Sequence, residues 1–230
     1  MEIIYLDDHL VAVNKPTGML VHRTDIAADV TAGFALQTVR DQIGKKVFPV
    51  HRIDRPTSGV LLFALSPAVA NAIRQQFDQH LITKEYLAIV RGHLAPEGKF
   101  DFPLKKENGQ IQEAITTYKT LEKITLPVPN DRYPTTRYSL VLAIPMHGRM
   151  HQIRRHFAKN RNYILGDTTY GNLKANRALQ AHCQVAGLLL HAAKLSFEHP
   201  ISKERIQCKC DLPDRFMKVL GRNQPNKNLL

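Results

Sequence analysis

A continuous apolar run from Gly59 to Leu65 is the feature of the sequence that most restricts the fold. A strand without a polar face must be covered on both sides, so it belongs in the interior of a sheet. The two residues that follow, a serine and a proline, suit the N-cap and the first position of a helix. Val69, Ile73 and Phe77 then recur every four residues. The run therefore predicts a buried strand followed by a helix that packs on the sheet.

The rest of the chain contains more predicted strands than helices. Further strands are predicted at residues 2–6, 10–13, 85–91, 114–124, 138–144, 188–197 and 206–210. Further helices are predicted at 34–43, 149–159 and 212–220, and the stretch 95–112, rich in charge and broken by Pro and Gly, is expected to be mostly loop. This pattern favours an α+β fold with a mixed, mostly antiparallel central sheet flanked by helices and loops.

No internal repeat and no low-complexity linker divides the sequence. We therefore expect residues 1–230 to form a single domain with two lobes, which ends in a flexible tail at about residues 222–230.

Charge is the informative part of the composition. The chain has 32 Lys and Arg against 20 Asp and Glu, a net charge of +12. The segment from Arg132 to Gly166 carries seven basic residues and no acidic one. Such an excess favours a polyanionic partner, because each Lys or Arg on a phosphate releases counterions. A solvated basic face remains the alternative. The three cysteines and the absence of a signal-peptide pattern favour a cytoplasmic protein.

The densest polar cluster is residues 51–59, His-Arg-Ile-Asp-Arg-Pro-Thr-Ser-Gly, directly before the buried strand. Asp54 lies between Arg52 and Arg55 in this segment. Nearby guanidinium groups would lower the pKa of the carboxyl and keep it ionised, as a carboxylate nucleophile requires. The alternative is an Asp turn in which hydroxyl and glycine residues serve only the backbone geometry.

This cluster resembles the catalytic-loop signature of the RluA family of pseudouridine synthases. Three further segments match the same family in its order: 14–18 (Asn-Lys-Pro-Thr-Gly, with Val-His at 21–22), 84–88 (Lys-Glu-Tyr-Leu-Ala) and 148–156 (Gly-Arg-Met-His-Gln-Ile-Arg-Arg-His), the last followed by Ile-Leu-Gly-Asp at 164–167. The resemblance implies the pseudouridine synthase fold, with an active-site cleft across the sheet. It also implies an isomerase that converts uridine in RNA to pseudouridine.

The resemblance assigns roles to several residues. Asp54 would attack the nucleotide covalently. Tyr86 would stack on the flipped uracil and help to remove the C5 proton, and Arg154 would pair with Asp54. Arg52 would fill the gap left by the extruded base or hold a phosphate, and Leu190 would form a wall of the uracil pocket. Further contacts to RNA are expected from Arg55, Arg149, Arg155, Lys159 and Arg161.

Residues 40–44, residues 132–138 and the doubled Arg154-Arg155 resemble the branch of the family that modifies uridine 65 of certain tRNAs. As in that branch, the chain starts at the catalytic domain, and no separate S4-like domain is expected. Gly187 stands where the family usually has Arg, so one basic contact is missing or replaced. The same chemistry on ribosomal RNA and a non-catalytic RNA-binding role remain alternatives.

Other chemistries find little support. A helix could bring two of His147, His151 and His156 onto one face, but the glycine at 148 interrupts that helix and no Cys or carboxylate stands at ligand spacing. Cys208 and Cys210 alternate across a strand and point to opposite faces. No Gly-rich nucleotide fingerprint and no apolar run of membrane-helix length is present. We therefore expect no metal, no cofactor, no membrane association and no obligate protein partner.

Overall fold

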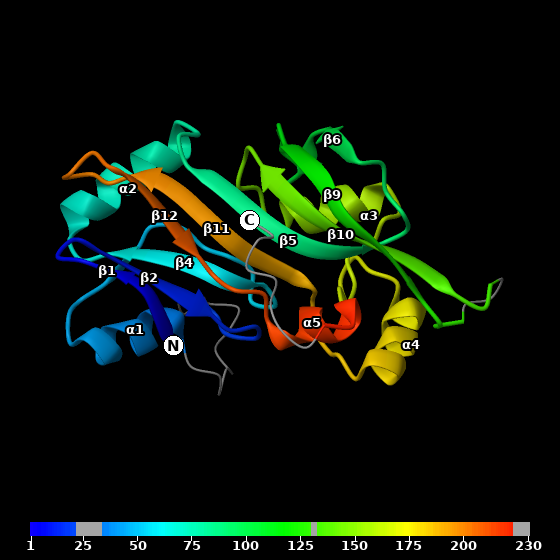
Figure 1. Cartoon of the computed structure of the whole chain (residues 1–230). Helices are drawn as coiled ribbons and strands as arrows, with labels where there is room; N and C mark the ends of the chain where they lie inside the picture. The colour runs from blue at the N-terminus through cyan, green and yellow to red at the C-terminus, as the bar shows by residue number, and fades with distance from the viewer. Residues whose placement is uncertain (22–33, 130–132, 223–230) are drawn as a thin grey trace. The chain divides into compact units, whose positions relative to one another are not determined.

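The computed structural model describes residues 1–21, 34–129 and 133–222 (Figure 1). The chain forms two compact units. Unit 1 contains Met1–Lys84 and Ala192–Cys210, and unit 2 contains Glu85–His191 and the residues from Asp211 onward. The chain therefore builds most of unit 1, then most of unit 2, returns to complete unit 1 and ends in unit 2. The tail expected at residues 222–230 lies, beyond its first residue, outside the described residues.

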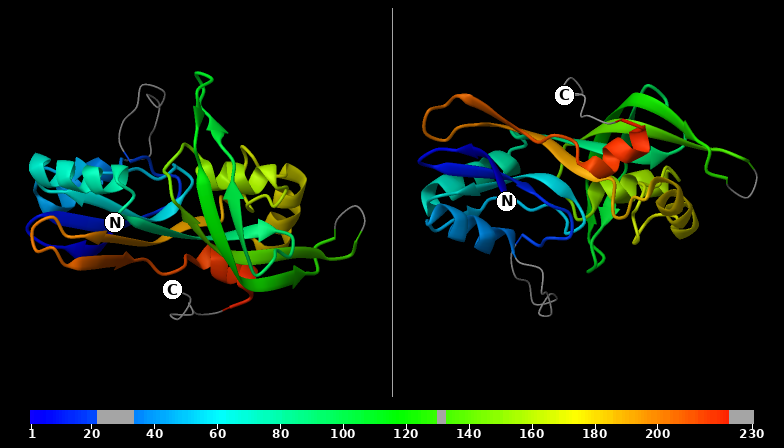
Figure 2. Two further views of the ribbon diagram at one scale, coloured as in Figure 1. Left: turned by 90° about the horizontal axis from the view of Figure 1, so that it is seen from above. Right: turned by 60° about the horizontal axis from the view of Figure 1, so that its bottom comes forward.

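Unit 1 is built on a sheet with two helices. Its strands are Glu2–Leu6 (β1), Leu10–Lys15 (β2), Phe48–Pro49 (β3), Ser58–Ala64 (β4), Leu190–Glu198 (β11) and Arg205–Lys209 (β12). Its helices are Ala35–Ile43 (α1) and Pro67–Asp78 (α2). The strand order is β1-β2-β4-β11, with β3 paired to β4 and β12 paired to β11. Both strands were predicted, β11 and β12 pair antiparallel, and they lie side by side in every view (Figures 1 and 2).

The predicted buried strand is confirmed, because all seven residues of β4 are buried. Its side chains alternate between two core clusters. The even-numbered residues of Val60–Ala64 pack in one cluster with Ile73 of α2, whereas Leu61 and Phe63 pack in the other with Val39 of α1. Each face of the strand is therefore covered by one helix, which is why the sequence of β4 has no polar face.

Both helices of unit 1 begin or end where the sequence indicates. The Ser66 hydroxyl accepts a hydrogen bond from the amide of Val69 at 3.3 Å, which caps α2. Helix α1 ends at Gly44, whose φ of +66° is the left-handed conformation that glycine adopts without strain.

Unit 2 is built on a second set of strands. They are Thr83–Arg91 (β5), Glu97–Asp101 (β6), Leu104–Lys105 (β7), Ile111–Gln112 (β8), Ile115–Leu126 (β9) and Thr136–Pro145 (β10). The helices are Gln152–Lys159 (α3), Leu173–Cys183 (α4) and Asp214–Leu220 (α5). The strands β5-β10-β9-β6 pair in that order, antiparallel throughout, and β7 pairs with β8 in a separate hairpin.

The core of unit 2 forms where α3 packs on this sheet. Ile153 and Phe157 of α3 lie in one cluster with Val90 of β5 and Val141 of β10. One face of α3 is thus apolar and buried, although the helix also carries Arg, His and Lys residues.

One prediction about unit 2 was wrong, and one helix was not predicted. The stretch 95–112, expected to be mostly loop, contains β6, β7 and β8. Its strands are short, and Gly98 sits inside β6 because a Cβ there would lie 2.6 Å from the Tyr118 ring. Helix α4 was not predicted at all. Only one residue of this helix, Leu179, is buried. The helix therefore lacks a strong apolar stripe; its sequence is Leu-Lys-Ala-Asn-Arg-Ala-Leu-Gln-Ala-His-Cys.

No helix among residues 1–21, 34–129 and 133–222 is both long enough and apolar enough to cross a membrane.

Candidate active site

Asp54 lies in the loop of unit 1 that joins β3 to β4. The backbone around it is fixed, because Ile53 is buried and the Thr57 amide donates to the Asp54 carbonyl at 3.0 Å. The Asp54 side chain is half-buried, and its sequence neighbours Arg52 and Arg55 are exposed. A half-buried carboxylate on a loop that runs straight into a buried strand is held by a rigid support, as a catalytic group requires.

The turn after β2 holds this loop in place. The Lys15 side chain is fully buried, and its ammonium group donates to the carbonyls of Pro16 at 3.0 Å, Met19 at 2.8 Å and Arg55 at 3.2 Å. The Gly18 amide donates to the Arg55 carbonyl at 2.8 Å, and Arg55 Nε donates to the Gly18 carbonyl at 3.0 Å. Two of the four matched segments, 14–18 and 51–59, are therefore joined by direct hydrogen bonds. His22, in the first of them, lies outside the described residues.

Lys15→Met is expected to lower the free energy of unfolding by about 2–3 kcal/mol, because it removes a buried, charged donor from three backbone carbonyl groups. Urea unfolding measures this change. Lys45→Met is the matched control, since Lys45 is exposed, and a change within about 0.5 kcal/mol is expected there. Equal unfolding midpoints for the two variants would contradict the anchoring role of Lys15.

His51, the first residue of the same segment, supports the loop rather than acting as an acid or base. Desolvation, with a smaller contribution from the charge of Lys84, lowers the pKa of His51 to about 3. The ring is therefore neutral at pH 7. Its Nε2 atom accepts a hydrogen bond from the Leu62 amide at 3.0 Å, and the ring stacks on Phe77 with centroids 5.1 Å apart.

Tyr86 and Leu190 meet in the core of unit 2. Tyr86 lies near the start of β5, where it is half-buried and pairs in register with Ala143 of β10. It packs against the cluster that contains Leu190 and Ile153. The structure thus brings together two predicted site residues and the sequence neighbour of a third, Arg154.

Arg154 is buried and forms a bidentate ion pair with Asp167. Arg154 Nε donates to Asp167 Oδ2 at 2.8 Å, and Nη2 donates to Oδ1 at 2.9 Å. The guanidinium carbon also lies 5.1 Å from the centroid of the Tyr170 ring. The amides of Thr169 and Tyr170 donate to Asp167 Oδ1 at 2.9 and 3.0 Å. This network fixes both the charge and the orientation of Arg154.

Burial alone would raise the pKa of Asp167, but hydrogen bonds from Arg154, Tyr170 and Thr169 and the charge of Arg154 outweigh it. The pKa of Asp167 therefore lies below its usual value, and the carboxylate is ionised at neutral pH. The match at 164–167 includes this residue, but no role was predicted for it. Asp54 belongs to unit 1, so its predicted pairing with Arg154 stays a prediction.

Two arginines predicted to contact RNA hold the β7–β8 hairpin. Arg155 Nη2 donates to the Lys105 carbonyl at 2.9 Å, and Arg149 Nε donates to the Glu113 carbonyl at 3.0 Å. Both side chains remain partly exposed. Their charge can still act on RNA, but part of their hydrogen-bonding capacity is used to position the hairpin.

The remaining predicted RNA contacts of unit 2 lie at the end of α3. Lys159 is exposed, and its ammonium nitrogen lies 4.1 Å from the centroid of the Phe102 ring. Arg161 is exposed and has a φ of +59°. Arg132, in the basic segment, lies outside the described residues.

The histidines near α3 bind backbone and hydroxyl groups. His147 Nδ1 accepts from the Ile115 amide at 3.1 Å, His151 Nδ1 lies 3.0 Å from the Tyr170 hydroxyl, and His156 Nδ1 lies 2.9 Å from the Thr116 hydroxyl. Within the described part of the chain, no three His, Cys, Asp or Glu side chains gather where they could hold a metal ion.

Gly187, which replaces the arginine usual in the family, has a φ of +86°. A side chain there would find open space but would strain the backbone. Its conformation therefore favours glycine at this position.

Comparison with known proteins identifies the class of protein. The family model for RNA pseudouridylate synthase matches residues 9–159, more than half of the chain. The chain belongs to the RNA pseudouridylate synthase family, and it is therefore an enzyme that isomerises uridine in RNA to pseudouridine. The predicted resemblance and the predicted fold class are confirmed.

Individual relatives are more specific. The chain is 52% identical to a tRNA pseudouridine synthase C of Pasteurella multocida, with 96% of this chain and 95% of the relative covered. It is 48% identical to the enzyme of the same name of Haemophilus influenzae, with 96% and 97% covered. The solved structure of human RNA Pseudouridylate Synthase Domain Containing 4 has a TM-score of 0.72 at 24% identity, with 98% of this chain and 95% of that chain covered. This likeness shows the same fold.

Proposed function

We propose that the enzyme acts on tRNA and converts uridine 65 to pseudouridine, with Asp54 as its nucleophile. The assignment of tRNA as the substrate is supported by sequence identity to two relatives named tRNA pseudouridine synthase C. The identities are 52% and 48%, along nearly the full length of both chains. The resemblance of residues 40–44 and of Arg154-Arg155 to the same branch of the family supports position 65. A tRNA substrate also implies a cytoplasmic location.

The proposed reaction is an isomerisation without a cofactor. The Asp54 carboxylate attacks the nucleotide, the bond between the ribose and N1 of uracil breaks, and the detached base turns. Carbon C5 then bonds to the ribose, the C5 proton leaves, N1 gains a proton, and the carboxylate is released unchanged. The base must first leave the stack, which costs a few kcal/mol that contacts with the protein have to offset.

Arg154 has the properties that such a carboxylate needs in a neighbour. It is buried and always charged, and its pair with Asp167 holds it in one orientation. We propose that Arg154 pairs with Asp54, as the resemblance to the family implies. Arg52 and Arg55 then add positive potential at the mouth of the site, and Leu190 forms an apolar wall for uracil.

Tyr86→Phe is expected to lower kcat by about 10²-fold or more, because the hydroxyl is the proposed acceptor of the C5 proton. Release of tritium from uridine labelled at C5 measures this step. The matched control is Tyr118→Phe, since Tyr118 packs against the same core cluster from β9. Both variants are expected to keep their unfolding free energy within about 1 kcal/mol. Unchanged kinetics for Tyr86→Phe would leave Tyr86 with a packing role only.

Deletion of the gene tests the substrate. Carbodiimide-based sequencing of total RNA from the deleted strain is expected to show the loss of pseudouridine at position 65 of tRNA. Re-expression of the wild-type chain should restore it, and the Asp54→Asn chain should not. Loss of a pseudouridine in ribosomal RNA, with tRNA position 65 intact, would instead support the ribosomal alternative.

A further inference from the structure

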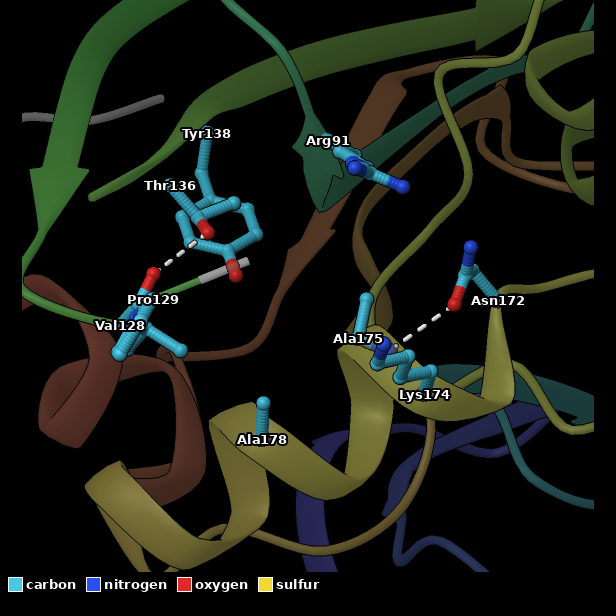
Figure 3. Close-up of a pocket in the computed structure, with 9 residues that line it drawn as sticks. All are labelled: Arg91, Val128, Pro129, Thr136, Tyr138, Asn172, Lys174, Ala175 and Ala178. Carbon is cyan, nitrogen blue, oxygen red and sulfur yellow. Dashed lines mark hydrogen bonds between the residues drawn. The ribbon is translucent and has the colours of Figure 1, made fainter. Parts of the chain in front are cut away.

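Unit 2 contains a pocket of about 80 Å³, and none of the residues that line it has been assigned a role in the reaction above. We call it the α4 pocket, and it is lined by Arg91, Val128, Pro129, Thr136, Tyr138, Asn172, Lys174, Ala175 and Ala178. Its volume is several times the roughly 10–15 Å³ that one water molecule needs. Figure 3 shows that it opens between the β10 side chains and the first turns of α4, with Arg91 above it.

The Tyr138 hydroxyl is a buried polar group at this pocket. The side chain is fully buried, and among the described residues its hydroxyl has no hydrogen-bond partner. Thr136 donates its own hydroxyl proton to the Val128 carbonyl at 2.7 Å. Figure 3 shows the Tyr138 oxygen on the side of the pocket that faces α4. A buried hydroxyl without a partner is costly, so it indicates a place where an acceptor can bind.

The other polar groups of the α4 pocket favour an anion as that acceptor. Helix α4 starts here, with the Asn172 side chain capping the Ala175 amide at 2.9 Å, so the positive end of the helix dipole lies at the pocket. Arg91 and Lys174 line the same space. Burial raises the pKa of Tyr138, although the side chain of Thr136 and the positive charge of Arg91 lower it to a smaller extent. The hydroxyl is therefore a donor at neutral pH, with a guanidinium close by.

None of the residues that line the α4 pocket is acidic. In the described segment from residue 133 to residue 197 the single acidic residue is Asp167, and its carboxylate is bound to Arg154. On β9, the strand beside Tyr138, Glu122 is paired with Arg222. The pocket is too small for a large organic ligand, and two cations would repel a metal ion.

We propose that the α4 pocket binds a phosphate group of the RNA backbone. Arg91, Lys174 and the start of α4 supply positive charge, and Tyr138 donates a hydrogen bond to a phosphate oxygen. The assignment rests on the RNA substrate of the proposed function. A phosphate held here fixes the position of the RNA on unit 2 without reading its sequence. The pocket is thus a binding site for the substrate outside the group of residues assigned to uracil.

Three single variants of the full chain test the proposal with an unmodified tRNA transcript. Lys174→Ala is expected to raise the dissociation constant about 3- to 10-fold near 0.1 M KCl, and to reduce the slope of log Kd against log [KCl] by about 0.7–0.9, the value of one phosphate contact. Tyr138→Phe should raise Kd about 3-fold without changing that slope, because it removes a neutral donor. Both should raise KM more than they lower kcat. Lys218→Ala is the control, because Lys218 is an exposed helical lysine of α5.

Crystals soaked in inorganic phosphate provide the second measurement, with an anion expected in the α4 pocket of the wild type and at lower occupancy in Tyr138→Phe. If phosphate binds there but Lys174→Ala and Tyr138→Phe bind RNA like Lys218→Ala, the pocket takes free phosphate and the RNA assignment is wrong. If the variants match the control and the pocket stays empty, the proposal is wrong altogether. A third outcome separates the two proposals. If the variants bind tRNA more weakly than the wild type, but the wild-type enzyme does not modify tRNA, the phosphate site is supported and the proposed function is refuted.

Discussion

Asp54→Asn is expected to abolish pseudouridine formation, with a loss in rate of more than about 10⁴-fold, the scale on which enzymes lose activity when a nucleophile is removed. An amide has nearly the same shape as a carboxylate but cannot form the covalent bond to the nucleotide. The loop should remain folded, because its known contacts to Lys15 and Gly18 involve the backbone and side chain of Arg55. Release of tritium from labelled uridine in a tRNA transcript measures the rate.

Binding separates this chemical effect from loss of structure. The Asp54→Asn variant should bind the transcript with a dissociation constant within about three-fold of wild type, because removal of one negative charge does not weaken contacts to phosphate. Asp78→Asn is the matched control, since Asp78 is an exposed aspartate at the end of α2 in the same unit, and it should retain full activity. Wild-type turnover by Asp54→Asn would show that the nucleophile is another group.

Asp167→Asn is expected to lower the free energy of unfolding by about 3–5 kcal/mol, because it leaves the buried Arg154 charge without its counter-ion. The Asn side chain also brings an NH₂ group against one of the two Arg154 nitrogens that now donate to the carboxylate. Urea unfolding monitored by circular dichroism measures the change. Activity should fall as well, because the orientation of Arg154 depends on this pair.

Two results define what the Asp167 measurement means. Asp101→Asn is the control, since Asp101 is paired with Lys99 at the surface of the same unit, and it should change the unfolding free energy by less than about 1 kcal/mol. A similarly small effect of Asp167→Asn would mean that Arg154 is held mainly by other contacts.

The same pair predicts the response to acid. The folded pKa of Asp167 is lowered from 3.8, so the folded state binds this proton less readily than the unfolded state. The stabilisation is present above about pH 4 and disappears as the pH falls through the folded pKa. Below about pH 4 the wild type should therefore lose more of its free energy of unfolding than Asp167→Asn does, because the variant has no carboxyl group at this position.

The sequence predicted the parts of the fold that depend on local patterns. The apolar run of β4 could be read because both faces are covered, and the cap of α2 because Ser66 forms its hydrogen bond within one turn. Helix α4 escaped prediction because it buries little, and Asn172 and Leu179 alone give a weak pattern. Short strands such as β7 and β8 depend on pairing partners that the local sequence does not reveal.

The sequence indicated which residue types belong to the candidate site. It did not indicate which groups these residues contact. Asp54, Tyr86 and Arg154 stand out through short motifs, and those motifs are local. The partners of the charged groups are distant in sequence: Asp167 for Arg154, and the carbonyls of Lys105 and Glu113 for the arginines of the α3 segment. Such pairs arise only when the chain is folded, so a single sequence contains no direct signal for them.

Unit 1 is discontinuous, and this has a consequence for synthesis of the chain. Its strand β4 lies beside β11, and its core includes Phe197 and Cys208, which are synthesised only after the segment Glu85–His191 of unit 2. The apolar surface of the amino-terminal part of unit 1 therefore remains exposed until β11 and β12 have been synthesised. Unit 2 in turn receives α5 only from the last residues, so neither unit is complete before the chain is nearly finished, and nascent chains stalled before residue 192 should depend on chaperones.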